Sequence, residues 1–314
     1  GPFLMGSTSE EVARWKAFFR ERVDDGTYQF EDLPADELKA VFDAWLEAEE
    51  GEHEVNLPPF AIAKYPVTNA QFERFIEAKG YENPAYWGGE ESAGWRWRQG
   101  EGEGWGRPPE RRDRPYYWRD PRYNGRNRPV VGVTWYEAVG YCNWLTETLR
   151  ERGELGPDEV IRLPSEAEWE KAARDGLPSP SQGEGQGVRV WPWGDEWNEA
   201  KANTWEAGPK TTTAVGIYPD GASPCDALDM IGNVWEWCRT RWGRTWQKPD
   251  FEYPYVPDDG REAIEDDPER PFLRVLRGGS WSHFQESARC AYRGRFEPGY
   301  WSDIVGFRCA RGSP

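Results

Sequence analysis

Apolar side chains recur at helical spacing in two segments near the start of the chain. The first set is Trp15, Phe18, Phe19 and Val23, and the second is Leu38, Val41, Phe42 and Trp45. Positions that repeat every three or four residues share one face of a helix, so each set predicts an amphipathic helix. We expect the two helices to form a hairpin that is inserted at about 9–50.

Three further helices are predicted by capping boxes, in which Ser or Thr is followed three residues later by Glu or Gln. The boxes are Thr68–Gln71, Thr134–Glu137 and Ser165–Glu168. An apolar run follows each box, and Gly176 is expected to end the third helix. Short strand-like segments such as Phe3–Ser7 lie between the helices. The pattern therefore predicts an α+β fold with much irregular chain.

A loop insertion at about 84–128 is rich in Trp and Tyr among Gly, Arg and Glu, with no helical or strand period. Aromatic rings beside Arg can stack on nucleobases or sugars. The alternative, which we favour, is that these rings pack a long loop onto the domain as a small core of its own.

The segment at about 276–311 also lacks a period, and stiff Gly-rich or apolar motifs bound it at Arg277–Trp281 and Val305–Cys309. Between them stand Ser, His, Phe, Tyr, Arg, Trp, Gly and Asp. Tyr, Trp and Arg offer large rigid contact areas, and Ser, Gly and Asp offer adaptable hydrogen bonds, a mixture typical of recognition loops. The alternative is an irregular, well-packed loop.

Composition and charge narrow the classes of protein. A chain of 314 residues with 37% hydrophobic and 15% aromatic residues can bury a large core. Its 39 basic and 56 acidic residues give a net charge of −17, which disfavours nucleic acid and anionic membranes as partners. With no long apolar run and no signal-peptide pattern, we expect no membrane insertion and a cytoplasmic location. Abundant Arg, Trp, Pro and Glu and only two Met suit a thermophile.

Cysteine and histidine are scarce. Five cysteines are too few for a disulfide scaffold at this length, and an odd number leaves at least one unpaired. The two histidines, His53 and His283, cannot build a multi-histidine metal site, and we expect both on the surface.

Motifs along nearly the whole chain resemble, in order, those of the formylglycine-generating-enzyme (sulfatase-modifying factor) family. They are Phe3–Ser7, Tyr65–Asn69, Pro129–Trp135, Arg162–Glu170, Trp193–Asp195, Gly232–Trp237, Arg277–Trp281 and Gly306–Arg308. The resemblance implies a single C-type-lectin-like domain over 1–314. That fold is α+β, with a small twisted antiparallel sheet, flanking helices and extensive loops.

The family's chemistry is not expected here. The resemblance implies a reactive cysteine pair just after the Gly-Gly-Ser-aromatic motif, but Ser282–Ser287 contains no thiol. The iron-dependent sulfoxide synthases of the same fold need three histidines. We therefore expect no enzyme and no required cofactor, with a divergent metal-dependent oxidase as the less favoured alternative. The resemblance also implies a disulfide between Cys142 and Cys290.

The C-terminal segment further resembles the variable proteins of diversity-generating retroelements. Their pattern of Gly-Gly-Ser-Trp, Arg-x-Ala-x-Arg, Pro and Gly-Phe-Arg fits the spacing from Gly278 to Arg308. The resemblance implies a non-catalytic display protein with a diversified binding surface at about 282–304. The expected ligand-binding residues are Ser282, His283, Phe284, Glu286, Tyr292, Gly294, Arg295, Phe296, Tyr300, Trp301, Ser302 and Asp303.

That resemblance also implies how the residues vary. Diversity in this family arises at adenines, largely in asparagine codons, which reach Ser, His, Phe, Tyr, Gly, Arg, Asp and Ile but not Trp or Glu. Glu286 and Trp301 are then fixed or come from other codons. The expected partner is an unknown protein or surface ligand, the expected state a monomer, and the location cytoplasmic or phage-associated, in a thermophilic bacterium or its prophage. An ordinary non-catalytic member of the fold remains the main alternative.

The resemblance to the family also implies a calcium site. The loop from Asp229 to Glu236 resembles the family's calcium loop, in which side-chain oxygens at Asp229 and Glu236 and the carbonyls of Gly232 and Val234 are ligands. Hard oxygen donors from a short loop suit Ca²⁺. The alternative is that Glu236 pairs with an arginine inside a Trp-rich core.

Overall fold

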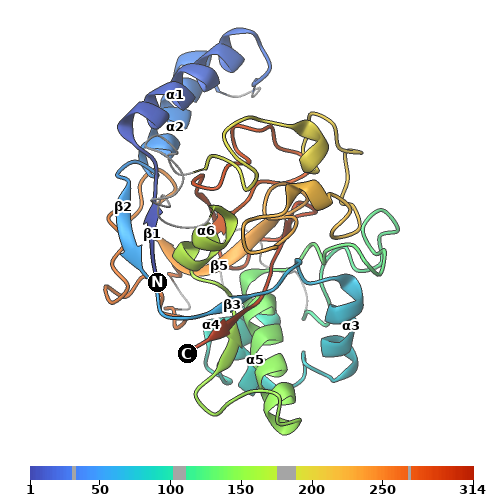
Figure 1. The fold of residues 1–314 in the computed structure, drawn as a ribbon. Helices are drawn as coiled ribbons and strands as arrows, with labels where there is room; N and C mark the ends of the chain where they lie inside the picture. The colour runs from blue at the N-terminus through green and yellow to red at the C-terminus, as the bar shows by residue number, and fades with distance from the viewer. Residues whose placement is uncertain (30–32, 102–110, 175–188, 268–269) are drawn as a thin grey trace.

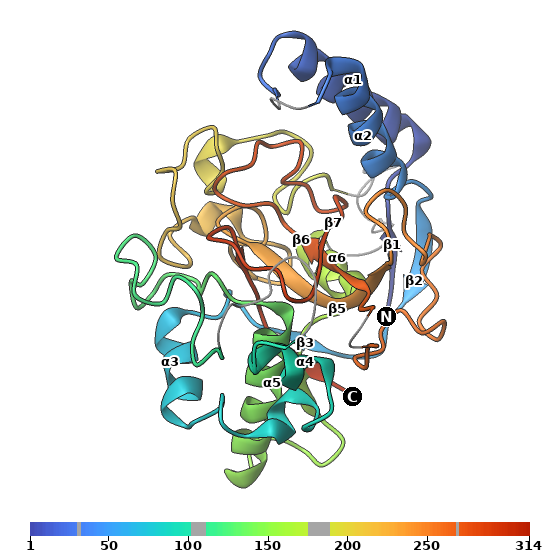
Figure 2. The ribbon, with the colours of Figure 1, turned by 180° about the vertical axis from the view of Figure 1, so that it is seen from behind.

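The computed structural model describes residues 1–29, 33–101, 111–174, 189–267 and 270–314. The α+β architecture expected from the sequence is confirmed. A helical hairpin lies at one end of the molecule, helices α3, α4 and α5 lie at the other, and the largest sheet lies between them (Figures 1 and 2). No helix in the described ranges is both long and apolar enough to cross a membrane.

The α-helices are α1 (Ser9–Asp24), α2 (Ala35–Glu47), α3 (Asn69–Glu77), α4 (Ala93–Arg98), α5 (Trp135–Glu151) and α6 (Glu166–Arg174). They begin directly after residues whose side chains cap them, except α2, which follows Pro34. Complete capping boxes at Thr68 and Thr134 open α3 and α5. At α6, Ser165 and Glu168 exchange two hydrogen bonds between side chain and backbone. Gly176, the expected end of α6, lies outside the described residues.

Helices α1 and α2 form the predicted hairpin. A capping box at Thr8, not recognised in the sequence, opens α1. Phe19 of α1 stacks on Phe42 of α2 with ring centroids 4.5 Å apart, and Trp15 of α1 meets Trp191 of the main body at 6.0 Å. The hairpin core is therefore continuous with that of the rest of the molecule.

Three small sheets carry the strands. They are β1 (Pro2–Met5) with β2 (His53–Asn56); β3 (Ala61–Ile62), β9 (Ala310–Gly312) and β4 (Val160–Arg162); and β7 (Gly294–Phe296), β6 (Leu273–Arg277), β5 (Trp235–Gly243) and β8 (Val305–Gly306), in that spatial order. The pairs are antiparallel except β5 with β8, which is parallel. Strand β7 forms one edge of the four-stranded sheet, so the C-terminal segment supplies both of its edges.

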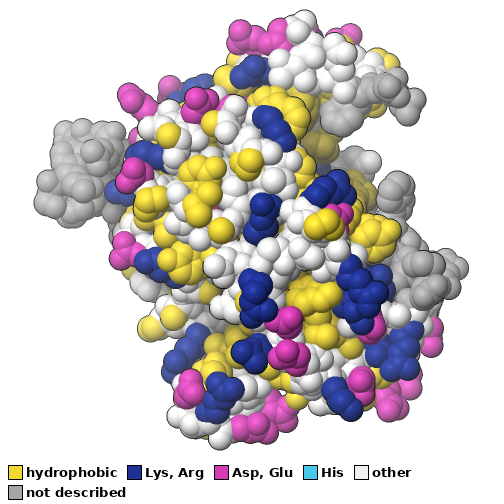
Figure 3. Space-filling model, turned by 90° about the vertical axis from the view of Figure 1, so that its right-hand side faces the viewer, with side chains coloured by type: hydrophobic (Ala, Val, Ile, Leu, Met, Phe, Trp, Pro, Cys, Tyr) yellow, Lys and Arg dark blue, Asp and Glu magenta, His cyan; other side chains and the backbone are white. Residues whose placement is uncertain are grey.

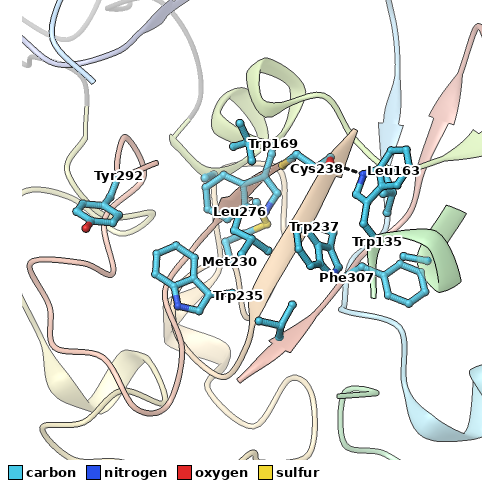
Figure 4. Packing of buried hydrophobic residues seen from close by; sticks show 14 of the residues in the cluster. Trp135, Leu163, Trp169, Met230, Trp235, Trp237, Cys238, Leu276, Tyr292 and Phe307 are labelled. Carbon is cyan, nitrogen blue, oxygen red and sulfur yellow. Dashed lines mark hydrogen bonds between the residues drawn. The ribbon is translucent and has the colours of Figure 1, made fainter. Parts of the chain in front are cut away.

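Tryptophans dominate the core around β5. Trp135, Trp169 and Trp237 are fully buried, and the Trp135 indole donates to the carbonyl of Cys238 at 3.0 Å (Figure 4). Because the regular elements are short, large aromatic rings from helices, strands and loops fill much of the space between them.

The aromatic loop insertion does not form only a core of its own. Its described part contains the 3₁₀ helix η1 (Pro84–Trp87) as well as α4. Trp87 and Trp97 join the main core, whereas Tyr117 and Tyr123 belong to a small separate cluster. Two further 3₁₀ helices, η2 (Glu199–Lys201) and η3 (Pro219–Gly221), lie in the loops before β5.

Candidate functional site

Four arginines of the C-terminal segment hold its backbone against the rest of the fold. Each pairs with a buried glutamate from another part of the chain: Arg277 with Glu170, Arg289 with Glu49, Arg293 with Glu166, and Arg308 with Glu236. All eight side chains are at most 2% exposed. Removing one partner of such a pair leaves an uncompensated buried charge, so these contacts fix where the intervening backbone lies.

Between these anchors, Phe296 and Tyr300 form a stacked pair. Their ring centroids are 3.8 Å apart, their planes differ by 6°, and both side chains are half-buried. Trp246, from the loop after β5, packs edge-on against Phe296 at 5.0 Å and is 38% exposed. The pair thus presents aromatic area at the surface beside a more exposed ring.

A second stack involves Trp301. Its ring lies 3.5 Å from that of Tyr116, with 15° between the planes, and Tyr116 is 49% exposed. Tyr117 meets Trp301 nearly at a right angle at 6.0 Å. The half-buried Asp303 carboxylate accepts from the hydroxyl of Tyr123 at 2.5 Å. The aromatic loop insertion therefore completes this part of the surface.

His283 and Phe284 lie at a third place. The His283 ring contacts the Ser280 hydroxyl at 2.8 Å and packs edge-on against Trp235 at 5.2 Å. Burial lowers the pKa of His283 to about 4, so the ring is neutral at physiological pH. Phe284 packs against Tyr28 of the hairpin at 5.6 Å and against the 40% exposed Trp205 at 6.1 Å.

The expectation of one exposed surface is wrong for three of the predicted ligand-binding residues. Glu286 is 0%, Arg295 4% and Tyr292 5% exposed. The hairpin explains part of this burial, since Tyr28 donates to Glu286 at 2.6 Å and Trp45 lies 4.6 Å from the Arg295 guanidinium. The other nine are half-buried: Ser282, His283, Phe284, Gly294, Phe296, Tyr300, Trp301, Ser302 and Asp303. His53 and His283, both expected on the surface, are half-buried.

Three rings that sequence reasoning did not assign to this surface contribute to it. Trp205, Trp246 and Tyr116 come from loops far from the segment in sequence, and each contacts one of its aromatic residues. The only signal in the sequence was their position in Gly-, Pro- and Arg-rich loops. On the face shown in Figure 3, hydrophobic side chains form small patches separated by Lys and Arg.

A family model described as a sulfatase-modifying factor enzyme 1-like domain matches residues 21–313. The chain belongs to the sulfatase-modifying factor family. Among its relatives, the formylglycine-generating enzyme of Thermomonospora curvata is 32% identical over 303 residues, covering 85% of this chain and 87% of the relative. The inactive C-alpha-formylglycine-generating enzyme 2 of Bos taurus is 31% identical over 296 residues, covering 83% and 79%. The names of sulfatase-modifying factor relatives thus include both an enzyme and an inactive protein.

Other relatives of this sulfatase-modifying factor chain are longer. The serine/threonine-protein kinase pkn1 of Chlamydia caviae is 32% identical over 271 residues, which are 83% of this chain but 34% of the relative. The chain thus spans about a third of that protein's length. Among solved structures, Treponema denticola variable protein 1 matches with a TM-score of 0.52 and 21% identity, covering 84% of this chain and 88% of that one. PvdO from Pseudomonas aeruginosa matches at 0.55 and 23%, covering 99% and 91%. Both likenesses show the fold.

In the loop that resembles the family's calcium site, the carboxylate oxygens expected to bind calcium accept hydrogen bonds from other residues. Arg308 donates to both carboxylate oxygens of Glu236, at 2.5 and 2.7 Å, and the Trp169 indole donates to it at 2.7 Å. A guanidinium bound to the proposed ligand disfavours a divalent cation at the same oxygens. Asp229 accepts from the Gly216 amide at 2.6 Å, and burial raises its pKa to about 6. These contacts fit the arginine pairing better than calcium.

The five cysteines are free thiols, and the predicted partner of Cys142 is wrong. The sulfur of Cys142 lies 4.0 Å from that of Cys309, while Cys290 is buried elsewhere, with its carbonyl bonded to Arg277. Sequence spacing alone cannot decide such a pairing.

Proposed function

We propose that this chain is a non-catalytic ligand-binding protein whose surface between Ser282 and Ile304 is diversified to change its ligand. The stacked pair of Phe296 and Tyr300 carries the proposal, because two rings held in contact at the surface beside Trp246 offer preformed aromatic area. Side chains that are already ordered lose little conformational entropy when a partner binds.

The division between fixed and half-buried positions supports diversification. The Arg–Glu pairs hold the backbone in place. Under the proposal, the mutation process does not change these side chains. Eight half-buried positions carry residues that mutated asparagine codons can encode: Ser282, His283, Phe284, Gly294, Phe296, Tyr300, Ser302 and Asp303. Tyr292 and Arg295 are also in that reachable set, but their burial makes them poor positions for free variation.

The state of the thiols supports a non-catalytic role. The thiolate is the form of cysteine that attacks substrates and binds metals. Burial raises the pKa of Cys290 to about 12 and those of Cys142 and Cys238 well above the ordinary range. In addition, no group of three or more His, Cys, Asp or Glu in the described part of the chain is arranged to hold a metal.

A display library tests the proposal. Gly294 would be kept, because a Cβ there would lie 3.0 Å from the Trp235 ring. The other seven positions would be randomised together, and clones would be selected against lysozyme as a test protein. We expect most unselected clones to melt cooperatively and binders to emerge. A matched library would randomise Glu286, Tyr292 and Arg289, which are buried in the same segment, and we expect most of its clones to unfold. General unfolding of the first library would favour the ordinary, well-packed member of the fold.

A further inference from the structure

Arg295 differs from the four paired arginines of the same segment. Its Nε and Nη2 atoms both donate to the backbone carbonyl of Trp246, at 3.0 and 2.7 Å. No carboxylate of a described residue forms an ion pair with Arg295. Burial, together with the like charge of Arg293, lowers the pKa of Arg295 to about 10, and the Tyr292 hydroxyl only partly opposes this shift. Arg295 is therefore a cation at neutral pH that the described chain leaves without a counter-ion.

The burial of Arg295 makes the absence of a counter-ion energetically unfavourable. The side chain is 4% exposed, and its guanidinium lies 4.6 Å from the ring centroids of both Trp45 and Trp242. Cation–π contacts and a carbonyl acceptor replace only part of the lost hydration, since a buried charge needs an opposite charge or a full set of hydrogen bonds. Folding thus maintains a partly desolvated cation that has no opposite charge among the described residues.

One nitrogen of Arg295 remains open to a ligand. Nη1 makes no hydrogen bond to a described residue, and it is not among the side-chain atoms sealed from solvent. Strand β7 lies at the edge of its sheet. The half-exposed Trp246 packs against this strand: its carbonyl accepts from Arg295, and its ring contacts the ring of Phe296. Because consecutive residues of a strand point to opposite faces of the sheet, Arg295 and Phe296 do not share a face, and Trp246 is the residue that contacts both.

We infer that Arg295 binds a carboxylate of the ligand while the ligand's apolar part packs on Trp246. The inference rests on the proposed function and names the ligand class of the same surface: an acid that carries an apolar or aromatic group. A carboxylate supplies the missing counter-ion and accepts charge-assisted hydrogen bonds from the guanidinium.

The net charge of −17 favours a carboxylate over a phosphate as the bound group. Fields from distant acidic residues are screened within about 8 Å at physiological salt, so the contact with Arg295 dominates the binding of a single charge. One guanidinium neutralises only one charge, so a doubly charged phosphate would leave a second negative charge without a partner in largely apolar surroundings. A monoanion is therefore the better match.

The test compares an acid with its neutral analogue. Phenylacetate, phenylacetamide and phenyl phosphate would be titrated into the full chain, and binding would be followed by the line widths of the probes in NMR. We expect phenylacetate to bind at least tenfold more tightly than phenylacetamide and more tightly than phenyl phosphate. Arg295→Met should remove the preference for the acid. Arg126→Met, at an exposed arginine, should preserve it.

Melting temperatures of the free variants separate ligand binding from a structural role. Arg295→Met should leave the melting temperature unchanged or raise it, because it removes an unpaired buried charge. Arg293→Met should lower the melting temperature, because it leaves the buried Glu166 carboxylate without a counter-ion. A large drop in Arg295→Met would assign Arg295 to the fold and overturn the inference.

The titration also separates this inference from the proposed function. Equal binding of acid and amide, lost together in Phe296→Ala/Tyr300→Ala, would remove the carboxylate anchor and leave the aromatic binding surface in place. Failure of phenylacetate to bind the unmodified chain would also overturn the anchor, and the display library would then decide the function independently.

Discussion

Arg308 and Glu236 form a buried, two-pronged ion pair, with nitrogen–oxygen distances of 2.5 and 2.7 Å. Arg308 comes from the Gly-Phe-Arg motif that closes the C-terminal segment, and Glu236 from β5 at the centre of the largest sheet. The Trp169 indole and the carbonyl of Leu228 complete their hydrogen bonding. The end of the segment is thereby fixed to the core.

Replacing Arg308 with Met should lower the free energy of unfolding by about 3–5 kcal/mol, because Glu236 would remain buried without a counter-ion. Urea denaturation would measure the loss. Arg126→Met, which breaks an exposed pair with Glu73, is the matched control and should cost at most about 1 kcal/mol. Equal effects of the two variants would show that the buried pair does not hold the segment.

Calcium binding at the Asp229–Glu236 loop stays a prediction, with the arginine pair as the favoured alternative. Under that alternative, EDTA should leave the melting temperature unchanged and added CaCl₂ should not raise it, because an ion that binds only the folded state raises stability with its concentration. Elemental analysis of the purified chain would accompany the melt. A rise in melting temperature that saturates with CaCl₂ would restore the calcium site.

Replacing Phe296 and Tyr300 with Ala together should abolish binding of a selected ligand at a small cost in stability. Both rings are half-buried, so we expect the free energy of unfolding to fall by about 1–2 kcal/mol. Phe307→Ala, at a fully buried ring nearby in sequence, should cost about 3–5 kcal/mol. If the surface variant unfolds as readily as Phe307→Ala, the rings serve packing and not binding.

Mild oxidation should link Cys142 to Cys309, because their sulfurs are already 4.0 Å apart and only a short movement is needed. A disulfide that closes so long a loop should stabilise the fold by about 2–4 kcal/mol. Peptide mass spectrometry would identify the bond, and Cys309→Ala should prevent it while Cys290→Ala should not. A bond between Cys142 and Cys290 would contradict the arrangement seen here.

Protonation of His283 should make the free energy of unfolding depend on pH between about 4 and 6.5. Its pKa is about 4 in the folded chain, and the ordinary value of 6.5 applies when the chain unfolds. Because the folded pKa is lowered, this contribution is present above pH 6.5 and is lost as pH falls toward 4. The stability difference between the unmodified chain and His283→Gln should therefore shrink from pH 7 to pH 4 in urea titrations. A difference independent of pH would contradict the burial of this ring.

The fold was accessible to sequence reasoning because its signals are local. The capping boxes at Thr68 and Thr134 lie within four residues, and the apolar spacing of Trp15 and Leu38 predicts helices without knowledge of partners. The ordered motifs along the chain then indicated the family. Such signals depend only on residues that are close in sequence, so they can be recognised without knowledge of the structure.

The candidate site was less accessible because its contacts join distant parts of the chain. Glu286 reads as a surface residue until Tyr28, 258 positions away, bonds to it. The hairpin was predicted as an insertion, yet its Trp45 helps to bury Arg295, and no local sequence pattern predicts that contact. The stack of Trp301 on Tyr116 likewise requires the path of a long loop. Burial across such distances is a tertiary property.

Sequencing the 3′ end of the gene across a population of cells would show directly whether the binding surface is diversified. We expect substitutions that arise at adenines and concentrate at the eight half-buried reachable positions, with Arg277, Arg293 and Arg308 unchanged. We also expect a near-copy of this coding repeat and a reverse-transcriptase gene in the neighbouring DNA. A uniform sequence with neither of these genetic elements nearby would contradict a diversified binding surface.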